Sequence, residues 1–237
     1  TLAQSTANDG SARVSIPAEA TDEARIKEEA VRNYFFAVNS GDFTVDAGRE
    51  APQTTITKGP PSNGFRLAPQ GRIRFSSSNP GSTYECTVDG RPIECDAADG
   101  AQYRNLGSGT HRFTVAARDS EGNVDPTPAV RRWARPFPVG ALSRSGGWTR
   151  SRNDNAFRGA FVRTSRPGAT LTRRASGVER VALVVARSRN AGRVAVSVGG
   201  QRVAIRNLQA DRFAAKVLLP LPRLASARSG AVTVRTL

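Results

Sequence analysis

Residues 84–128 constrain the fold more than any other part of this chain, because they combine strand alternation with a closely spaced pair of cysteines. Apolar side chains recur at every second position in two stretches, first at Tyr84, Cys86 and Val88 and then at Phe113, Val115 and Ala117. A period of two is typical of half-buried β-strands. The segment therefore predicts an all-β module.

Cys86 and Cys95 are the two cysteines of the sequence. If residues 89–92 form a four-residue loop, Val88 pairs with Ile93 and Cys86 lies directly opposite Cys95. Such a pair places its Cβ atoms near disulfide distance. Two unrelated reduced cysteines in a core are the alternative. We predict the disulfide, on this register and on a composition typical of secreted proteins.

Several motifs of the same region resemble a known family. They are Phe-Ser-Ser-Ser at 75–78, Cys-Thr-Val-Asp-Gly at 86–90, Cys95, Gly-Thr-His-Arg-Phe at 109–113 and Asp-Ser-Glu-Gly-Asn at 119–123. Over roughly residues 52–135 the chain resembles the bacterial immunoglobulin-like, fibronectin-type-III-like repeat of large secreted proteins from high-GC bacteria. The resemblance implies a sandwich of seven strands used as a spacer or adhesive unit. It implies no reaction.

Length and charge predict three modules. A chain of 237 residues fits two or three small domains. Residues 1–50 carry 5 basic and 9 acidic side chains, residues 51–136 carry 11 and 8, and residues 137–237 carry 19 and 3. This shift near Pro136 and Pro138 predicts a domain boundary. We therefore expect modules at 1–50, 51–136 and 137–237.

The location is expected to be extracellular or at the cell surface. The sequence has no apolar run long enough to span a membrane, and residue 1 is not followed by a charged and then apolar leader. Export by a high-GC bacterium is therefore inferred from the modules and the cysteine pair.

Residues 137–237 predict a basic all-β sandwich or jelly roll. Strand candidates lie at Trp148 and at 157–161, 178–186, 194–198, 202–205, 213–219 and 231–234. The outline from Gly-Gly-Trp-Thr at 146–149 to Gly-Arg-Val-Ala-Val-Ser-Val-Gly-Gly at 192–200 loosely resembles jelly-roll accessory modules of secreted actinobacterial enzymes and wall proteins. Some members of that class bind glycans.

The run Val-Gly-Gly-Gln at 198–201 predicts a two-residue hairpin turn. The same register places Ser197 opposite Arg202, and Arg193 opposite Arg206, on the outer face. Two guanidiniums across a strand pair repel each other unless an anion bridges them. We therefore expect Arg193, Arg202 and Arg206 to take part in binding anionic polymers such as wall teichoic acid or acidic polysaccharide. An arginine-rich surface that reflects codon usage and only keeps the protein soluble is the alternative.

Carbohydrate and nucleic acid are two other ligand classes for this basic module. A carbohydrate-binding module is one alternative function, with Trp148 as the candidate ring that stacks on a sugar. Aromatic content is only 6%, so core packing can use the few rings present. Nucleic acid is not favoured, because the arginines are spread along the module and not interleaved with aromatic residues on one sheet.

Residues 1–50 predict the closing strands of a truncated sandwich, with candidates at 12–16, 24–30 and 34–38; a short helix at 22–29 is the alternative. Asn-Asp-Gly-Ser at 8–11, Ala-Arg-Ile-Lys at 24–27 and the segment from Tyr34 to Val45 resemble, over residues 1–46, the sandwich tail of secreted reprolysin-like zinc metallopeptidases. Glu28 departs from that pattern, because it falls where alternation calls for an apolar residue. A buried carboxylate without a partner is costly, so either this face is exposed or the module has drifted.

The sequence contains no catalytic constellation. A zinc peptidase of this kind needs two histidines one helical turn apart with a glutamate between them. His111 is the one histidine, and it is expected to pack or to form hydrogen bonds at a strand end. We therefore expect no enzyme within these residues, and any catalytic domain upstream of residue 1. A fragment with activity of its own is the remaining alternative.

The loop at residues 119–125 groups oxygen-bearing side chains, which calcium favours. Its spacing does not follow an EF-hand, and a turn in which Asp side chains bind local amides is the preferred interpretation. No cofactor is expected, and calcium at Asp119, Glu121 and Asp125 is the alternative.

Together, the patterns predict tandem β-sandwiches that form a non-catalytic spacer and attachment region. Its expected partners are an anionic polymer or glycan and upstream domains of the same polypeptide.

Overall fold

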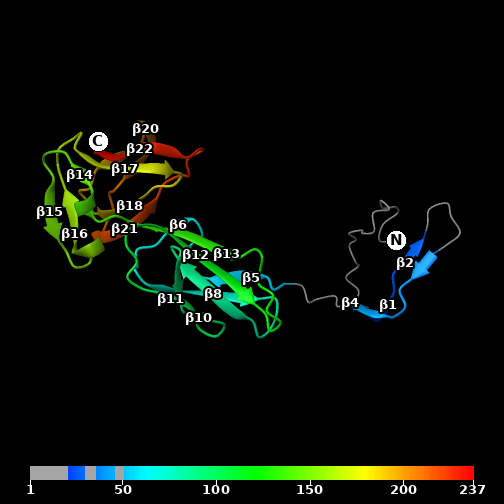
Figure 1. Cartoon of the computed structure of the whole chain (residues 1–237). Coiled ribbons are helices and arrows are strands. Elements are labelled where there is room, and N and C mark those ends of the chain that lie inside the picture. Colours follow the sequence, from blue (N-terminus) through cyan, green and yellow to red (C-terminus); the bar gives the residue numbers. More distant parts are fainter. Residues whose placement is uncertain (1–20, 30–35, 46–50) are drawn as a thin grey trace. The chain divides into compact units, whose positions relative to one another are not determined.

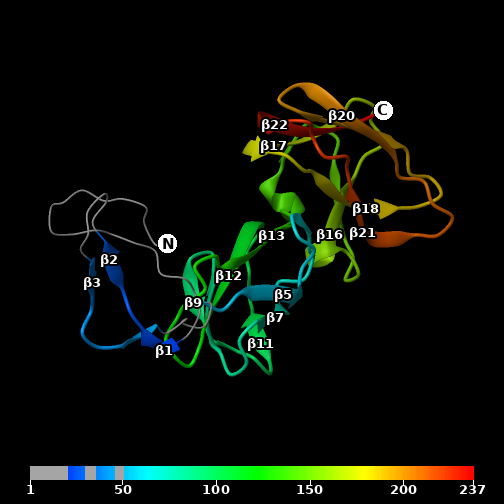
Figure 2. The same ribbon diagram turned by 90° about the vertical axis from the view of Figure 1, so that its right-hand side faces the viewer.

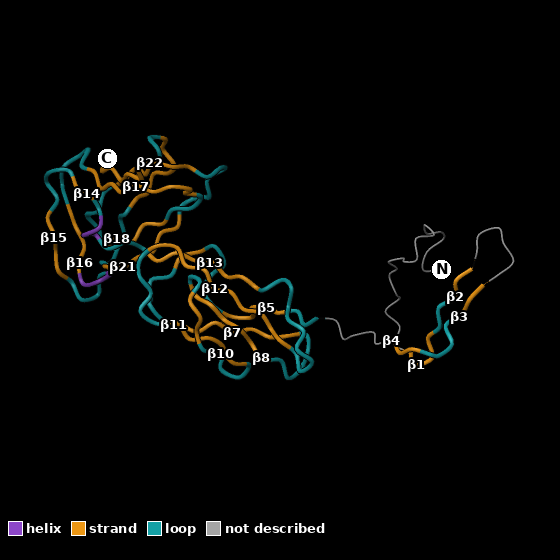
Figure 3. The backbone as a smooth tube through the Cα atoms, viewed as in Figure 1, coloured by secondary structure: helices purple, strands orange, loops and turns teal. Residues whose placement is uncertain are grey.

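A computed structural model of the chain describes residues 21–29, 36–45 and 51–237. The chain divides into two compact units, residues 1–51 and 52–237. Strands and loops make up almost all of the described residues (Figure 1), so the predicted all-β fold is confirmed. The helices of this part are two short 3-10 turns, η1 (Val139–Ala141) and η2 (Phe157–Gly159), neither of which could cross a membrane (Figure 3).

Within residues 21–29 and 36–45, the first unit contains two short antiparallel strand pairs. β1 (Thr21–Ala24) pairs with β4 (Phe43–Val45), and β2 (Lys27–Glu29) pairs with β3 (Phe36–Val38). The alternative helix at 22–29 is therefore wrong, and the strand candidate at 12–16 lies outside the described residues. Ile26 is 42% exposed and Glu28 is exposed as well, so this face of the ribbon carries its carboxylate in solvent.

The second unit begins with a two-layer sandwich. One layer has the order β10-β11-β7-β5 and the other the order β6-β13-β12-β8-β9. Figure 2 labels β5, β7 and β11 of the first layer and β9, β12 and β13 of the second. The strands are β5 (Thr54–Lys58), β6 (Gly64–Phe65), β7 (Gly71–Ser77), β8 (Thr83–Val88), β9 (Arg91–Ile93), β10 (Cys95–Asp96), β11 (Gly100–Tyr103), β12 (Gly109–Arg118) and β13 (Ala129–Arg135). We call residues 52–136 the first sandwich.

Strand alternation builds the core of the first sandwich as the sequence predicts. Phe113, Val115 and Ala117 on β12 have no exposed surface, and Cys86 and Val88 on β8 are buried beside them. Ile73, Phe75, Tyr103 and Trp133 complete the cluster from other strands of both layers. Full burial of a side chain such as Val, Ile or Phe contributes roughly 1.5–3 kcal/mol relative to exposure. The core therefore accounts for the association of the two sheets.

The β8–β9 hairpin has a different register from the predicted one. Asp89 and Gly90 have φ values of 53° and 78°, and together they form a two-residue turn. Cys86 therefore pairs with Ile93, and Cys95 continues into β10 of the opposite layer. An Asp-Gly pair favours this turn because both central positions need positive φ. The prediction of a four-residue loop did not take this preference of the Asp-Gly pair into account.

The predicted disulfide between Cys86 and Cys95 is present in the structure. Because the two cysteines lie on β8 and β10, the bond joins the two layers instead of bridging neighbouring strands of one sheet. The pairing was therefore predicted for a register that the structure does not have.

Residues 137–237, the second sandwich, contain a sheet with the order β14-β17-β22-β19-β20 and the two ribbons β15-β16 and β18-β21. Their bounds are β14 (Ser143–Arg144), β15 (Thr149–Arg152), β16 (Ala160–Arg163), β17 (Thr170–Val178), β18 (Ala182–Arg187), β19 (Arg193–Val198), β20 (Gln201–Asn207), β21 (Ala214–Pro220) and β22 (Arg228–Thr236). Val196 and Val198 pack with Val181, Leu221 and Leu224 in a small apolar core.

The sequence patterns do not predict β17, because this strand carries arginines at positions where strand alternation calls for apolar residues. The Arg173 guanidinium carbon lies 3.7 Å from the centroid of the Phe137 ring, and the group donates a hydrogen bond to the Ala141 carbonyl oxygen at 3.1 Å. The long stem of arginine can cover apolar surface while its charged end is satisfied elsewhere. Arg173 therefore occupies a half-buried strand position that alternation assigns to apolar side chains.

We predict that removing the disulfide destabilises the first sandwich. The bond closes a sequence separation of 9 residues, and such a loop contributes about 2–3 kcal/mol through the unfolded chain. Urea unfolding of the Cys86→Ala, Cys95→Ala double variant, followed by Trp133 fluorescence in a Trp148→Phe background, should show this loss. The prediction would be contradicted if the double variant, the oxidised parent and the reduced parent all unfolded at the same urea concentration.

Candidate functional site

Asp119 lies in the loop after β12 and is 8% exposed. Its Oδ1 accepts hydrogen bonds from the backbone N–H groups of Glu121 and Asn123, at 3.1 and 2.9 Å. Its Oδ2 accepts from the side-chain amides of Asn123 and Asn79, at 3.1 and 3.5 Å. Burial alone would raise the pKa of Asp119, but these hydrogen bonds outweigh it and lower the pKa.

Asp125 plays the same part at the other end of this loop and is 2% exposed. Oδ2 accepts from the Thr54 backbone N–H at 2.8 Å, and Oδ1 accepts from the Thr127 backbone N–H at 2.7 Å. Burial alone would raise the pKa of Asp125, but hydrogen bonds from Thr54 and Thr127 outweigh this effect, and the net pKa is lowered. The carboxylate therefore ties β5 to the start of β13.

These contacts support a structural role for the loop. The oxygens of Asp119 and Asp125 accept from amides of their own turn, of β5 and of Asn79, and the Glu121 side chain is exposed. Within the described part of the chain, no group of three His, Cys, Asp or Glu side chains is placed to hold a metal ion. The geometry therefore favours amide binding over calcium as the task of these carboxylates.

We predict that acid weakens the first sandwich through Asp125. Its folded pKa is lowered, so its contribution is complete above the unfolded value of about 3.9 and is lost as the pH falls through the folded pKa. Asp125→Asn should remove that part of the pH dependence and lower the free energy of unfolding at pH 7 by about 1–3 kcal/mol, since a buried N–H loses its acceptor.

Urea unfolding at pH 7 and at about pH 3 measures both effects. Glu121→Gln is the matched control, because it neutralises an exposed carboxylate of the same loop. Equal losses in the two variants would show that Asp125 acts only through net charge.

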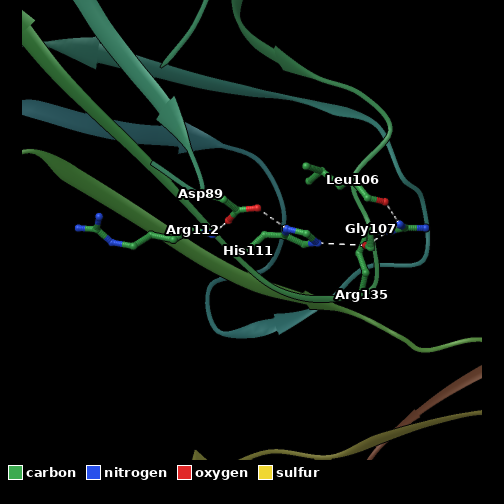
Figure 4. Close-up of polar contacts among 6 residues, drawn as sticks. All are labelled: Asp89, Leu106, Gly107, His111, Arg112 and Arg135. Atoms are coloured by element: carbon green, nitrogen blue, oxygen red, sulfur yellow. Dashed lines mark hydrogen bonds and ion pairs between the residues drawn. The ribbon is translucent and has the colours of Figure 1, made fainter. Parts of the chain in front are cut away.

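His111 is buried on β12 and lies at the centre of a second polar network (Figure 4). Its Nδ1 lies 2.8 Å from Asp89 Oδ2, and its Nε2 lies 3.2 Å from the Gly107 carbonyl oxygen. A carboxylate and a carbonyl both accept hydrogen bonds, so the ring makes both bonds only when both nitrogens carry protons. The predicted role of His111 in strand-end hydrogen bonding is confirmed.

Asp89 and Arg135 extend this network to the backbone. Asp89 Oδ1 accepts from the Arg112 backbone N–H at 2.8 Å. The buried Arg135 guanidinium donates to the carbonyl oxygens of Leu106 and Gly107, the latter at 2.7 Å (Figure 4), and to that of Leu67 at 3.1 Å. Burial lowers the pKa of Arg135, and the positive charge of Arg158 lowers it further. The arrangement connects a turn, a strand and two loops: the Arg135 donors face backbone carbonyl oxygens, and His111 Nδ1 faces the Asp89 carboxylate.

Substitutions at Asp89 should separate turn strain from loss of the network. Asp89→Gly keeps a residue that adopts positive φ easily, but it removes the acceptor of His111 and Arg112 and should cost about 1–3 kcal/mol of unfolding free energy. Asp89→Ala should cost roughly 1 kcal/mol more, because alanine resists the φ of 53°. The same urea assay measures both variants. A glycine variant as stable as the parent would exclude a contribution from the network.

The predicted arginine pair of the basic sandwich is not formed. Gly199 and Gly200 make the expected turn, and Ser197 pairs with Arg202 as predicted. A β-bulge follows, after which Val196 pairs with Ala204 and the register is shifted by one residue. A bulge places an extra residue on one strand and reverses its later alternation.

The bulge changes the pairing of two of the three predicted arginines, Arg193 and Arg206. Arg193 pairs with Asn207, and Arg206 pairs with Val194, so these two guanidiniums are not opposite each other. Arg206 donates to the carbonyl oxygen of Ile205 at 3.1 Å, and Arg193 and Arg202 are exposed. The shift occurs because Val203 and Ala204 both pack against the core, which leaves Ile205 41% exposed. Anion binding by these arginines stays a prediction. The cross-strand repulsion between Arg193 and Arg206, which was one reason for it, is absent from the structure.

Trp148 is half-buried just before β15. Its indole Nε1 donates a hydrogen bond to the Thr170 carbonyl oxygen at 3.1 Å, so the ring is fixed against the start of β17. A more exposed aromatic was missed by sequence reasoning. Phe213 is 56% exposed, and its ring centroid lies 6.1 Å from that of Phe161. Alternation had assigned Phe213 to a strand, but β21 begins one residue later.

The charge of the second sandwich is nearly uncompensated. Its 19 basic residues face 3 acidic ones, Asp154, Glu179 and Asp211. In the described part of this sandwich the one ion pair joins Arg223 to Glu179 at 2.9 Å, and both side chains are more than half exposed. The remaining guanidiniums therefore present their charge to backbone carbonyls or to solvent.

Comparison with known proteins gives little further information. The sequence matches no family model and no curated protein. Among solved structures, an alpha-L-rhamnosidase from Dictyoglumus thermophilum is similar with a TM-score of 0.33 and 11% identity, covering 78% of this chain and 24% of that chain. An alpha-L-rhamnosidase from Streptomyces avermitilis, complexed with L-rhamnose, has a TM-score of 0.26 and 15% identity, covering 77% and 21%. At these scores the likeness assigns no function.

Proposed function

We propose that this chain is a non-catalytic attachment region of a larger secreted or surface protein. In this proposal the first sandwich is a spacer, and the second sandwich binds anionic polymers of the cell wall or the extracellular matrix. The disulfide between Cys86 and Cys95 supports an oxidising location, because such bonds persist mainly outside the cytosol.

The observation that carries the proposal is the net charge of +16 on residues 137–237 together with a single ion pair among their described residues. Guanidinium groups bind carboxylates and phosphates through paired hydrogen bonds, and they are less strongly hydrated than ammonium groups. A surface with this excess of one sign also raises the local concentration of oppositely charged polymers. Both effects favour a polyanion as the partner.

Parallel titrations test this function. The full chain is titrated with polygalacturonate and with dextran, a neutral glucan, at several salt concentrations. We expect binding to polygalacturonate alone, and a loss of affinity of about tenfold or more between 0.1 and 1 M salt, since the Debye length shrinks from ~10 Å to ~3 Å. Arg202→Ser measures the contribution of one exposed arginine from the predicted site.

Two outcomes would overturn the electrostatic function. Binding to dextran that is as tight as binding to polygalacturonate, and unaffected by salt, would instead identify a module for neutral carbohydrate. Binding to neither polymer at low salt would leave the arginines a role in solubility alone.

A further inference from the structure

A pocket of about 300 Å³ in the second sandwich gathers three arginines around a partly apolar floor. Its lining includes Arg144, Arg150 and Arg158 together with Phe157, Val139 and Ala160. Pockets that hold small ligands begin at about this volume and combine an apolar wall with a few polar groups. The cavity therefore has the size and the lining of a ligand site.

The three arginines come from separate elements. Arg144 ends the short strand β14, which pairs with β17, and Arg150 lies on β15, opposite Val162 of β16. Arg158 belongs to η2, the 3-10 turn that leads into β16. Figure 1 shows β15 and β16 at one end of this sandwich, where the two strands pair with each other. Folding therefore brings three arginines from three different elements to one pocket.

Arg158 has a backbone conformation that arginine rarely adopts. Its φ of 55° and ψ of 36° lie in the left-handed region, and the next residue, Gly159, has a φ of 73°. This conformation is unfavourable for residues with a Cβ atom, and strained residues of this kind cluster at binding and active sites. A glycine would fit position 158 without strain, yet the position carries a guanidinium beside the cavity.

No counter-charge balances the pocket. Its lining contains no carboxylate. In the described part of the chain, the guanidiniums of Arg144, Arg150 and Arg158 have neither a hydrogen-bond partner nor an ion-pair partner, although a single ion pair serves the rest of the sandwich. Converging like charges repel one another, and an anion bound among them relieves that repulsion.

We propose that this pocket binds a sugar unit that carries a carboxylate, as part of an acidic polysaccharide. The guanidiniums of Arg144, Arg150 and Arg158 receive the carboxylate, because their planar donors match its two oxygens. The half-buried Phe157 ring, with Val139 and Ala160, offers an apolar surface to the C–H face of a pyranose. The inference rests on the proposed function and names the ligand class and the residues that recognise it.

Calorimetric titration of the full chain with trigalacturonic acid tests the site. Arg158→Gly is the main variant, because glycine relieves the left-handed strain while it removes the guanidinium together with its aliphatic stem. We expect it to fold normally and to bind at least tenfold more weakly. The Arg144→Ser, Arg150→Ser double variant should bind more weakly still, and Phe157→Leu should lose several-fold in affinity while keeping an apolar wall.

Arg174→Ser is the matched control, because it removes one positive charge from an exposed position of β17 outside the pocket, and it should bind like the parent. Unchanged affinity in Arg158→Gly and in the double variant would overturn the pocket, yet polygalacturonate binding by the parent would still support the proposed function. If the parent fails to bind polygalacturonate as well, the proposed function itself is wrong.

Two further titrations decide the ligand class. Maltotriose should not bind, because it lacks a carboxylate. Inorganic phosphate that binds as tightly as trigalacturonic acid would overturn the sugar-specific proposal and leave a general oxyanion site. Trigalacturonic acid binding at least tenfold tighter than phosphate supports the proposal.

Discussion

The two-residue turn at Asp89 and Gly90 sets the geometry on which much of the first sandwich depends. Because both residues have positive φ, β8 and β9 are joined by the shortest hairpin, and the chain reaches the opposite sheet by Cys95. The disulfide with Cys86 then connects the two layers. The same turn places the Asp89 carboxylate 2.8 Å from His111 Nδ1. One local conformation thus supports a covalent bond between the sheets and a polar network at their end.

The two sandwiches handle positive charge in different ways. In the first, the buried Arg135 donates to three backbone carbonyls, and the imidazole of His111 lies between a carboxylate and a carbonyl. Buried donors of this kind are tolerated because most of them find an acceptor, although Arg135 Nε is buried without a partner among the described residues. In the second, Arg173 is half-buried against the Phe137 ring and the Ala141 carbonyl oxygen, whereas Arg193 and Arg202 are exposed. In the proposed function, arginine therefore has a structural role in the first sandwich and a ligand-binding role in the second.

Sequence patterns were reliable where a feature depends on a few neighbouring residues. Alternation located β8 and β12, the Gly199-Gly200 pair located the β19–β20 turn, and the clustered Asp residues of the 119–125 loop predicted amide binding. The all-β fold follows from these signals. They failed at β17, where Arg173 covers apolar surface with its stem and hides the alternation.

The residues alone therefore specify the fold class and the charge of each module, because these depend on composition and on local backbone preference. Only tertiary packing decided the strand register and the place where charges converge. The bulge that separates Arg193 from Arg206 exists because Val203 and Ala204 both reach the core, a demand made by other strands. Arg144, Arg150 and Arg158 share no periodic spacing, and they line one pocket because β14, β15 and η2 meet at one end of the sandwich.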